Sequence, residues 1–330
     1  MTVGEWLDIW LAEYVRPHLR PKTYDSYESV IRLHVKPAIG GVRLRSLQTT
    51  HVQHMVNGIA SSGLSARMAG LTQVVLHAAL KQATMNGMVP RNVAEGARKP
   101  KTEKHPPRVL TPEEQAALME AAANDRLYPM VVTMLGTGLR IGEAVALRWD
   151  DVDLRQRRIQ VRQSATRAHT PAGETRTALI VQSPKTAAGR RSVALPPAIV
   201  ATLQQWHRQQ LEERLRMGKT WRDSGLVFTT SVGTMIGPRN FARKLTSLAA
   251  RAGIENVNPH ALRHTYATRA LEAGVPAREV QESLGHTTIT MTLDVYSHVL
   301  PEMKQAAADA IDKFLQPPKG RSSQIVVKST

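Results

Sequence analysis

The chain has 330 residues, of which 44 are lysine or arginine and 27 are aspartate or glutamate, so its formal net charge is +17, and it contains no cysteine. The lack of cysteine excludes a disulfide framework, a cysteine-based zinc module, an iron–sulfur cluster and a thiol nucleophile. The length suggests about two domains, and 42% hydrophobic residues are enough to form a folded core.

The positive charge is spread along the chain. Residues 1–104 hold 14 basic and 7 acidic side chains, and residues 105–330 hold 30 and 20. Because both regions are basic, we expect both to contact a polyanionic partner. A basic surface that binds nothing is the alternative. The few aromatic residues (5 Trp, 6 Tyr and 3 Phe) argue against stacking on unpaired bases, so we expect double-stranded DNA as the partner. Because no apolar run approaches the roughly 18 to 20 residues of a membrane helix, we expect a cytoplasmic protein without membrane contact.

The first hundred residues show the apolar spacing of helices. One stripe at helical spacing comprises Val3, Trp6, Leu7, Trp10, Leu11 and Tyr14. Further helices are predicted over 24–34, 51–59 and 66–85. Thr49 and Thr50 are capping candidates for the second of these, and Asn86-Gly87 should end the third. We therefore expect a small helical bundle over residues 1–94.

A linker and a second domain follow. Residues 95–108 contain three prolines and five Lys or Arg, which predicts an interdomain linker over 95–109 and a second domain over 110–316. Thr111, Pro112 and Glu114 form a helix-start signal with a capping box. The expected strands and helices of this domain are, in order, strands at 158–163, 178–182 and 191–195, and helices beginning at Tyr128 and spanning 197–217, 238–252, 259–273, 277–284 and 302–315. The expected fold class is mainly α with a small antiparallel β-sheet.

Four segments carry reactive side chains that packing does not require. They are residues 137–143, 183–186 and 260–264, and residues 284–286 followed ten residues later by Tyr296. Each has an ordinary explanation when taken singly, because surface arginines, solvated hairpin lysines and buried tyrosines are common. Their combination and their order are what carry the functional signal.

The ordered set resembles the tyrosine recombinase, or phage integrase, family, whose motif is Arg, Lys, His-x-x-Arg, His or Trp, and then Tyr. The matching positions are Arg140, Lys185, His260, Arg263, His286 and Tyr296. Residues 1–100 also look like the SAM-like core-binding domain of that family, so the resemblance spans nearly the whole chain. It implies a C-terminal tyrosine-recombinase catalytic domain after the helical bundle.

These residue types suit attack by an oxygen nucleophile on a DNA phosphodiester. Arg140 and Arg263 would stabilise the extra negative charge on the non-bridging oxygens. His260, three residues before Arg263, would project from the same helix face toward the same phosphate. Lys185 would protonate the departing 5′ oxygen, and His286 would hydrogen-bond the phosphate or help to deprotonate the nucleophile.

Tyr296 is the expected nucleophile. It would form a 3′-phosphotyrosyl link that conserves the phosphodiester energy, so that the DNA is resealed without ATP. A free tyrosine has a pKa of about 10, so attack at neutral pH needs the cationic surroundings. Glu143 matches the acidic position of the family and is expected to orient an arginine or a histidine. We expect no cofactor and no metal.

Two rival interpretations come from other classes. His260 and His264 stand four apart, as zinc ligands on a helix do, and His286 could be a third ligand. However, Ala261 replaces the glutamate of a zincin signature, and Arg263 would place a cation beside the metal, so we expect His264 to be a core or helix-capping residue. A non-catalytic DNA-binding protein is the second rival, and it leaves the six-residue set unexplained.

The resemblance implies a site-specific recombinase that integrates or excises a mobile element such as a prophage. It further implies a homotetramer on paired duplex sites, strand exchange through a Holliday junction, and a monomer or weak oligomer off DNA. Accessory DNA-bending or directionality factors are further candidate partners. The two basic domains would form a C-shaped clamp around the duplex, with phosphate contacts supplying most of the affinity. An arm-binding domain, which many phage integrases carry, is either naturally absent or truncated.

Residues 317–330 are expected to form a separate tail. Pro317 and Pro318 break the chain, and residues 323–328 are β-prone with no adjacent strand in the sequence. In related recombinases C-terminal segments dock on a neighbouring protomer, so one interpretation is that residues 325–327 add to a sheet edge in trans. A frayed terminus is the other.

Overall fold

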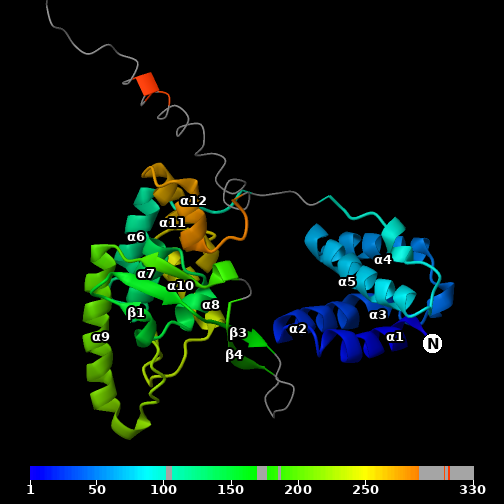
Figure 1. The fold of residues 1–330 in the computed structure, drawn as a ribbon, viewed down its shortest axis with the longest axis horizontal. Coiled ribbons are helices and arrows are strands. Elements are labelled where there is room, and N and C mark those ends of the chain that lie inside the picture. The colour runs from blue at the N-terminus through cyan, green and yellow to red at the C-terminus, as the bar shows by residue number, and fades with distance from the viewer. Residues whose placement is uncertain (102–105, 169–176, 185–186, 290–307, 309–310, 313–330) are drawn as a thin grey trace, which may run out of the picture. The chain divides into compact units, whose positions relative to one another are not determined.

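A computed structural model describes residues 1–101, 106–168, 177–184, 187–289, 308 and 311–312. The chain divides into two compact units, one comprising residues 1–105 and 165–181 and the other residues 106–164 and 182–330. The predicted domain boundaries assign residues 165–181 to the second domain, whereas this division groups them with the first unit. Each unit is described by itself below, and Figure 1 labels the elements of both.

The first unit is a bundle of helices. Its described helical elements are α1 (Val3–Trp10), η1 (Leu11–Val15), α2 (Pro21–Val30), η2 (Ile31–Val35), α3 (Lys36–Ile39), η3 (Leu44–Ser46), α4 (Thr49–Ser61), α5 (Ala66–Met85) and η4 (Val93–Gly96). Helices α1 and α2 each run into a π-helical turn, which the apolar spacing alone does not predict. The predicted helix 24–34 is therefore longer than expected and changes its winding after Val30.

Helix starts in this unit follow from side-chain caps. The Thr2 side chain accepts a hydrogen bond from the Glu5 N–H, and the Glu5 side chain accepts one from the Thr2 N–H, which is a complete capping box. The prediction that Thr49 or Thr50 caps α4 is wrong, because both are helical and the preceding Gln48 is the cap. Helix α5 has the predicted bounds, with Ser65 as its cap.

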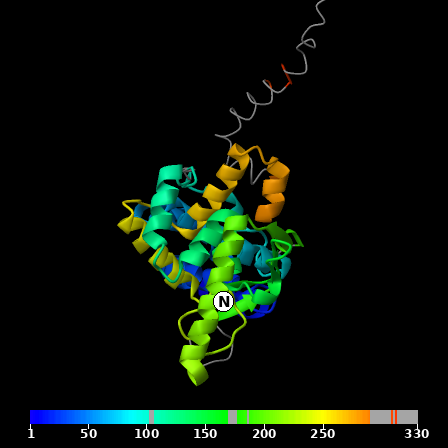
Figure 2. The same ribbon diagram turned by 90° about the vertical axis from the view of Figure 1, so that its left-hand side faces the viewer.

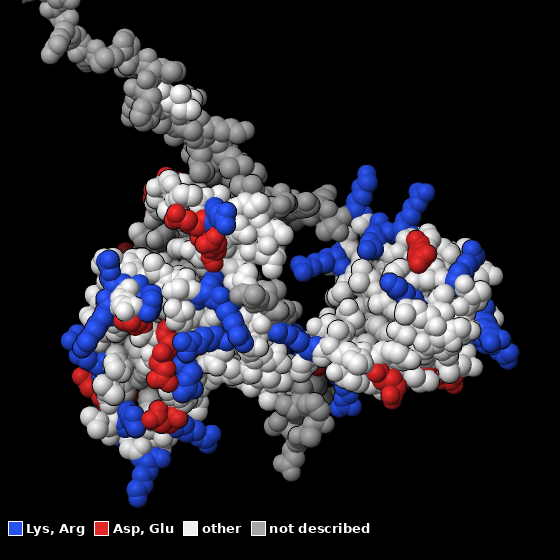
Figure 3. All heavy atoms as spheres, in the orientation of Figure 1, with Lys and Arg blue, Asp and Glu red and all other residues white. Residues whose placement is uncertain are grey.

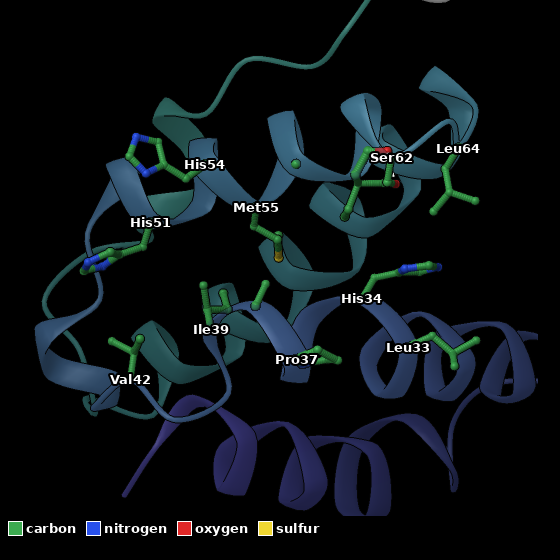
Figure 4. Close-up of a pocket in the computed structure, with 13 residues that line it drawn as sticks. Leu33, His34, Pro37, Ile39, Val42, His51, His54, Met55, Ser62 and Leu64 are labelled. Atoms are coloured by element: carbon green, nitrogen blue, oxygen red, sulfur yellow. Dashed lines mark hydrogen bonds between the residues drawn. The ribbon is translucent and has the colours of Figure 1, made fainter.

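A groove of about 510 Å³ lies on the first unit, beside α3 and α4 (Figure 4). Its apolar lining includes Leu33, Ile39 and Met55, and three histidines also line it: His34, His51 and His54. The His51 Nδ1 atom accepts a hydrogen bond from the Gln48 N–H, so one ring nitrogen is used by the start of α4. None of the residues expected to act on DNA phosphate lines this groove.

The second unit combines helices with a small sheet. Its described elements, apart from the β3–β4 pair, are α6 (Pro112–Ala122), α7 (Tyr128–Thr137), α8 (Ile141–Val145), η5 (Trp149–Asp151), β1 (Val152–Asp153), β2 (Arg158–Val161), η6 (Ala187–Gly189), β5 (Arg191–Ala194), α9 (Pro197–Met217), η7 (Gly218–Thr220), α10 (Pro238–Arg251), α11 (Pro259–Glu272) and α12 (Ala277–Leu284). The capping box of Thr111 and Glu114 is confirmed at the start of α6.

The main sheet has three strands, as predicted, but one of the three is not a predicted strand. Strands β1, β2 and β5 form an antiparallel sheet in which Ile159 lies opposite Val193. The strand predicted at 178–182 does not join it: β4 (Ala178–Gln182) pairs instead with β3 (Ser164–Ala168). Strand β3 is not predicted from the sequence because it is short and half polar, and strands adjacent in the sequence commonly pair with each other.

The helices of the second unit pack around α7. This helix contacts α6, α8, α9 and α11, and α12 contacts both α11 and strand β5. Figures 1 and 2 show α11 and α12 side by side in both views. The predicted helix at 302–315 lies almost wholly outside the described residues, and the tail at 317–330 lies entirely outside them.

Among the described residues, no helix is both long and apolar enough to cross a membrane.

Candidate active site

Arg140 lies in the turn between α7 and α8. Gly138 ends α7 in the left-handed conformation, with a φ of 63°, and Arg140 is the N-cap residue of α8. The Arg140 N–H donates to Glu143 Oε2 at 2.8 Å, and its Nη1 donates to Glu143 Oε1 at 2.9 Å. Its Nη2 donates to the Gly285 carbonyl at 3.2 Å. The side chain stays 35% exposed, so the guanidinium is oriented by the protein and still reachable from solvent.

Arg263 is held more deeply. It lies in α11 and is only 4% exposed. Its Nη1 donates to the Gly138 carbonyl at 2.8 Å and its Nη2 to the Leu284 carbonyl at 2.6 Å. These bonds tie α11 to the turn that carries Arg140 and to the end of α12, so three segments distant in the sequence meet at one guanidinium.

A buried ion pair lies behind Arg140. Arg191, on β5, binds both Glu143 carboxylate oxygens through Nη1 and Nη2, at 3.0 and 2.9 Å. Both side chains are about 5% exposed. Burial raises the pKa of Glu143, but the hydrogen bond and charge of Arg191, together with the charge of Arg140, outweigh it and hold the pKa below its usual value. Glu143 is therefore a carboxylate at neutral pH and contacts two arginines.

Three histidines surround the two arginines. Burial, followed by the charges of Arg263 and Arg140, lowers the pKa of His286 to about 4. Burial, followed by the charges of His260 and Arg263, lowers the pKa of His264 to about 4. His260 stays solvent-accessible, yet partial burial and the charges of Arg263 and Arg140 lower its pKa as well. At neutral pH these imidazoles are neutral, and each can donate one hydrogen bond and accept another.

His264 is not the N-cap of its own helix, α11. The cap of α11 is Asn258, whose side-chain oxygen accepts hydrogen bonds from the His260 and Ala261 N–H groups. His264 lies one turn further along, half-buried, with its ring centroid 6.4 Å from that of His260. In the described part of the chain, no group of three or more His, Asp or Glu side chains is arranged as metal ligands.

Five of the predicted site residues thus come together in the second unit: Arg140, Glu143, His260, Arg263 and His286. The other two, Lys185 and Tyr296, lie outside the described residues. The chain just after Lys185 does approach the site, since a Cβ added at Gly285 would lie 2.8 Å from the Ala188 carbonyl oxygen. Arg191 was not singled out from the sequence. The available signal was its position two residues before buried Val193, on the same face of a predicted strand.

The charge balance of this cluster favours an anion. Glu143 is the one carboxylate among the five described site residues and is already neutralised by Arg191, so the charges of Arg140 and Arg263 leave this cluster net positive. Forked guanidinium donors beside neutral imidazoles suit a phosphate group with charge developing on its oxygens. Figure 3 shows lysine and arginine side chains spread over the visible face of each unit, as a polyanionic partner requires.

A helical unit followed by a second unit in which two arginines and several histidines converge is the architecture of a tyrosine recombinase. The profile of the phage integrase family matches residues 108–303, and that of the phage integrase N-terminal SAM-like domain matches residues 2–60. The chain therefore belongs to the phage integrase family and is a tyrosine-type site-specific recombinase.

Individual relatives agree with this assignment. A tyrosine recombinase XerC-like protein of Caldanaerobacter subterraneus subsp. tengcongensis is 30% identical over 327 residues, which cover 94% of this chain and 83% of the relative. An integrase of Streptomyces ambofaciens is 29% identical, with 94% of this chain and 80% of the relative covered.

Solved structures share the fold. The Tn1549 transposon integrase in complex with transposon right end DNA has a TM-score of 0.77 and 22% identity, covering 93% of this chain and 100% of that chain. A lambda integrase tetramer bound to a Holliday junction has a TM-score of 0.66 and 20% identity, covering 89% of this chain and 77% of that chain.

Proposed function

We propose that this recombinase cuts and rejoins duplex DNA through a covalent 3′-phosphotyrosyl intermediate, with Tyr296 as the nucleophile, to integrate or excise a mobile element. The observation that carries the proposal is the convergence of Arg140, Arg263, His260 and His286 around one cationic position in the DNA-free protein. Two guanidinium groups would bind a scissile phosphate there and stabilise its negative charge, and the neutral histidines would donate hydrogen bonds to it.

The proposed reaction accounts for every proton and every bond made or broken with side chains of this protein and the DNA. The Tyr296 oxygen attacks phosphorus and loses its proton, and the neutral imidazole of His286 is the proposed acceptor of that proton. The bond from phosphorus to the 5′ oxygen breaks, and Lys185 supplies the proton that the leaving oxygen takes up. Reversal with a new 5′ hydroxyl reseals the strand, because the phosphotyrosyl bond retains the energy of the phosphodiester.

The proposal extends to assembly. The lambda integrase relative was solved as a tetramer bound to a Holliday junction, and the Tn1549 integrase relative was solved with transposon DNA. We propose the same arrangement here: four protomers on two duplex sites, both basic units of each protomer on the duplex, and sequential strand exchange. Accessory bending or directionality proteins belong to the same proposal.

Covalent trapping tests the nucleophile. DNA from the flanks of the gene is screened for recombinant junctions, and the identified site is then built as a nicked suicide substrate. Wild-type protein should accumulate a covalent adduct on a denaturing gel, and Tyr296→Phe should bind the site equally well without forming any adduct. Tyr266→Phe is the matched control and should retain adduct formation. Adducts persisting in Tyr296→Phe would assign the nucleophile elsewhere.

Leaving-group chemistry tests Lys185. On a substrate with sulfur at the bridging 5′ position the leaving thiolate needs no proton. Lys185→Ala should therefore be slow on ordinary DNA and largely restored on the sulfur substrate, whereas Arg140→Ala should not be restored. Equal defects of Lys185→Ala on both substrates would move the proton-donor role to another residue.

A further inference from the structure

All three guanidinium nitrogens of Arg191 donate hydrogen bonds inside the protein. Nη1 and Nη2 bind the two Glu143 oxygens, Nε donates to the Ser283 carbonyl at 2.5 Å, and Nη1 also reaches the Gly189 carbonyl at 3.4 Å. The side chain is only 6% exposed. Arg191 is therefore not placed to bind DNA phosphate itself.

The groups that Arg191 contacts belong to the two segments that carry Arg140 and His286. Glu143 accepts hydrogen bonds from both the backbone and the side chain of Arg140. The Ser283 carbonyl lies three residues before His286, and the Gly285 carbonyl between them accepts from Arg140. One buried guanidinium thus connects the Arg140 turn to the segment that ends at His286.

The packing around this connection leaves little freedom. The backbone of Arg191 is fixed by its pairing with Val161 in the sheet. Gly285 has a φ of 64°, and a Cβ added there would lie 3.1 Å from both Cδ and Nη1 of Arg191. A left-handed glycine permits the close approach of the loop to the arginine.

We propose that Arg191 is a positioning residue of the active site: it holds Glu143 and the 283–285 segment so that Arg140 and His286 face the scissile phosphate. This inference rests on the proposed function, because it assigns a role within that reaction. The competing explanation is that Arg191 and Glu143 form an ion pair that only stabilises the fold. The two explanations predict different cleavage rates: if Arg191 acts through Arg140, its loss should slow cleavage most on a substrate whose phosphate charge Arg140 must neutralise.

A DNA substrate with an uncharged scissile phosphate distinguishes the two explanations. Replacing one non-bridging oxygen of the scissile phosphate by a methyl group removes the negative charge that Arg140 would stabilise. Cleavage of this methylphosphonate and of ordinary DNA is compared on suicide substrates with the full-length protein. Wild-type protein must first form an adduct on ordinary DNA, and its failure to do so would refute the proposed function instead of the role of Arg191.

The expected result is a difference between the two substrates. Arg191→Met should slow cleavage of ordinary DNA by about 100-fold, the size of effect that misplacement of a catalytic group produces, and should slow the methylphosphonate by less than about tenfold. Arg126→Met is the matched control, because Arg126 also forms a partly buried ion pair in the second unit, with Glu213, and its other partners in the described part of the chain are not site residues. It should change both substrates equally.

Folding is checked by thermal unfolding of each variant. If Arg191→Met does not fold, Arg191→Lys takes its place, since lysine keeps the charge and lacks the forked geometry; its deficit should again be larger on ordinary DNA than on the methylphosphonate. A folded variant that cleaves ordinary DNA at the wild-type rate, or that loses the same factor on both substrates, would overturn the positioning role.

Discussion

The two arginines of the site are held by different means, and this sets what each contributes. Arg263 is buried and donates two hydrogen bonds to backbone carbonyls of other segments. Arg140 is 35% exposed and is oriented chiefly by Glu143, a neighbour in its own turn. Arg263 is therefore part of the packing as well as of the site, whereas Arg140 can be removed with little loss of packing.

This difference predicts separable effects of alanine substitution. Arg140→Ala should reduce adduct formation by about 100- to 1,000-fold, the usual cost of losing one charge-stabilising donor, with little change in the melting temperature. Arg263→Ala should reduce cleavage similarly and also lower the free energy of unfolding by about 2 to 4 kcal/mol, because two buried carbonyls lose their partners. Urea denaturation and suicide-substrate assays measure the two quantities. Equal stability of the two variants would contradict the packing role of Arg263.

The histidines predict how stability depends on pH. The folded-state pKa of His264 and of His286 is about 4, below the ordinary value of 6.5, so between these values the unfolded chain binds more protons than the folded protein. Stability therefore rises with pH across this window and falls as the pH drops from 6.5 toward 4. Both side chains are only half-buried, so water screens part of the effect.

The measurement is the melting temperature of the DNA-free protein as a function of pH. Wild-type protein should lose stability progressively below pH 6.5, and His264→Gln should show a shallower loss because one of the titrating groups is gone. A wild-type melting temperature that is constant from pH 7 to pH 4.5 would contradict the lowered pKa values.

Gly138 determines how the end of α7 meets α11 and α12. A Cβ added there would lie 2.5 Å from Tyr266 Cδ1 and 2.8 Å from Leu284 Cδ2, in addition to the strain of a positive φ. Gly138→Ala should therefore destabilise the protein by about 2 to 4 kcal/mol, from backbone strain and overpacking together. Gly63 has a similar φ of 80° with no atom within 4 Å of its added Cβ.

The matched substitution Gly63→Ala isolates the backbone part of that cost. It should lower the free energy of unfolding by only about 1 to 2 kcal/mol, since no packing is disturbed. Because the Gly138 carbonyl accepts from Arg263, Gly138→Ala should also slow cleavage, which Gly63→Ala should not. Equal destabilisation by the two substitutions would show that Tyr266 and Leu284 yield easily.

Helices with clear punctuation could be predicted closely from the sequence. The bounds of α5, α9 and α12 match the predicted ranges, because each combines regular apolar spacing with a proline, serine or glycine at its ends. The strand pairing could not be predicted in the same way. β3 lacks the apolar alternation of a buried strand, and which of two candidate strands pairs with β2 depends on contacts between distant residues.

In the site, too, features set by local sequence could be predicted and features set by contacts between distant residues could not. The motif positions were recognisable because residue type and order carry the chemistry. Arg191 was not, since an arginine at the start of a strand usually lies in solvent, and only the fold brings it to Glu143, 48 positions away in the sequence. Likewise the lowered pKa values of the histidines come from burial, which the sequence does not contain.

The distribution of charge over both units leads to a prediction about affinity. Residues 1–104 carry twice as many basic as acidic side chains, and residues 105–330 carry a further excess of ten. If both units bind the duplex backbone, each displaces counterions, and the slope of log K against log salt concentration becomes steeper by about 0.9 for every phosphate neutralised.

Binding measured at a series of salt concentrations tests this with the full chain and with a fragment of residues 105–330. The fragment should bind more weakly and show a shallower slope, because the contacts made by the first unit are gone. Circular dichroism establishes that the fragment is folded, and Arg140→Ala in the full chain controls for the loss of a single phosphate contact, which should reduce the slope by about one. Equal slopes for a folded fragment and the full chain would mean that the charge of the first unit does not face the DNA backbone.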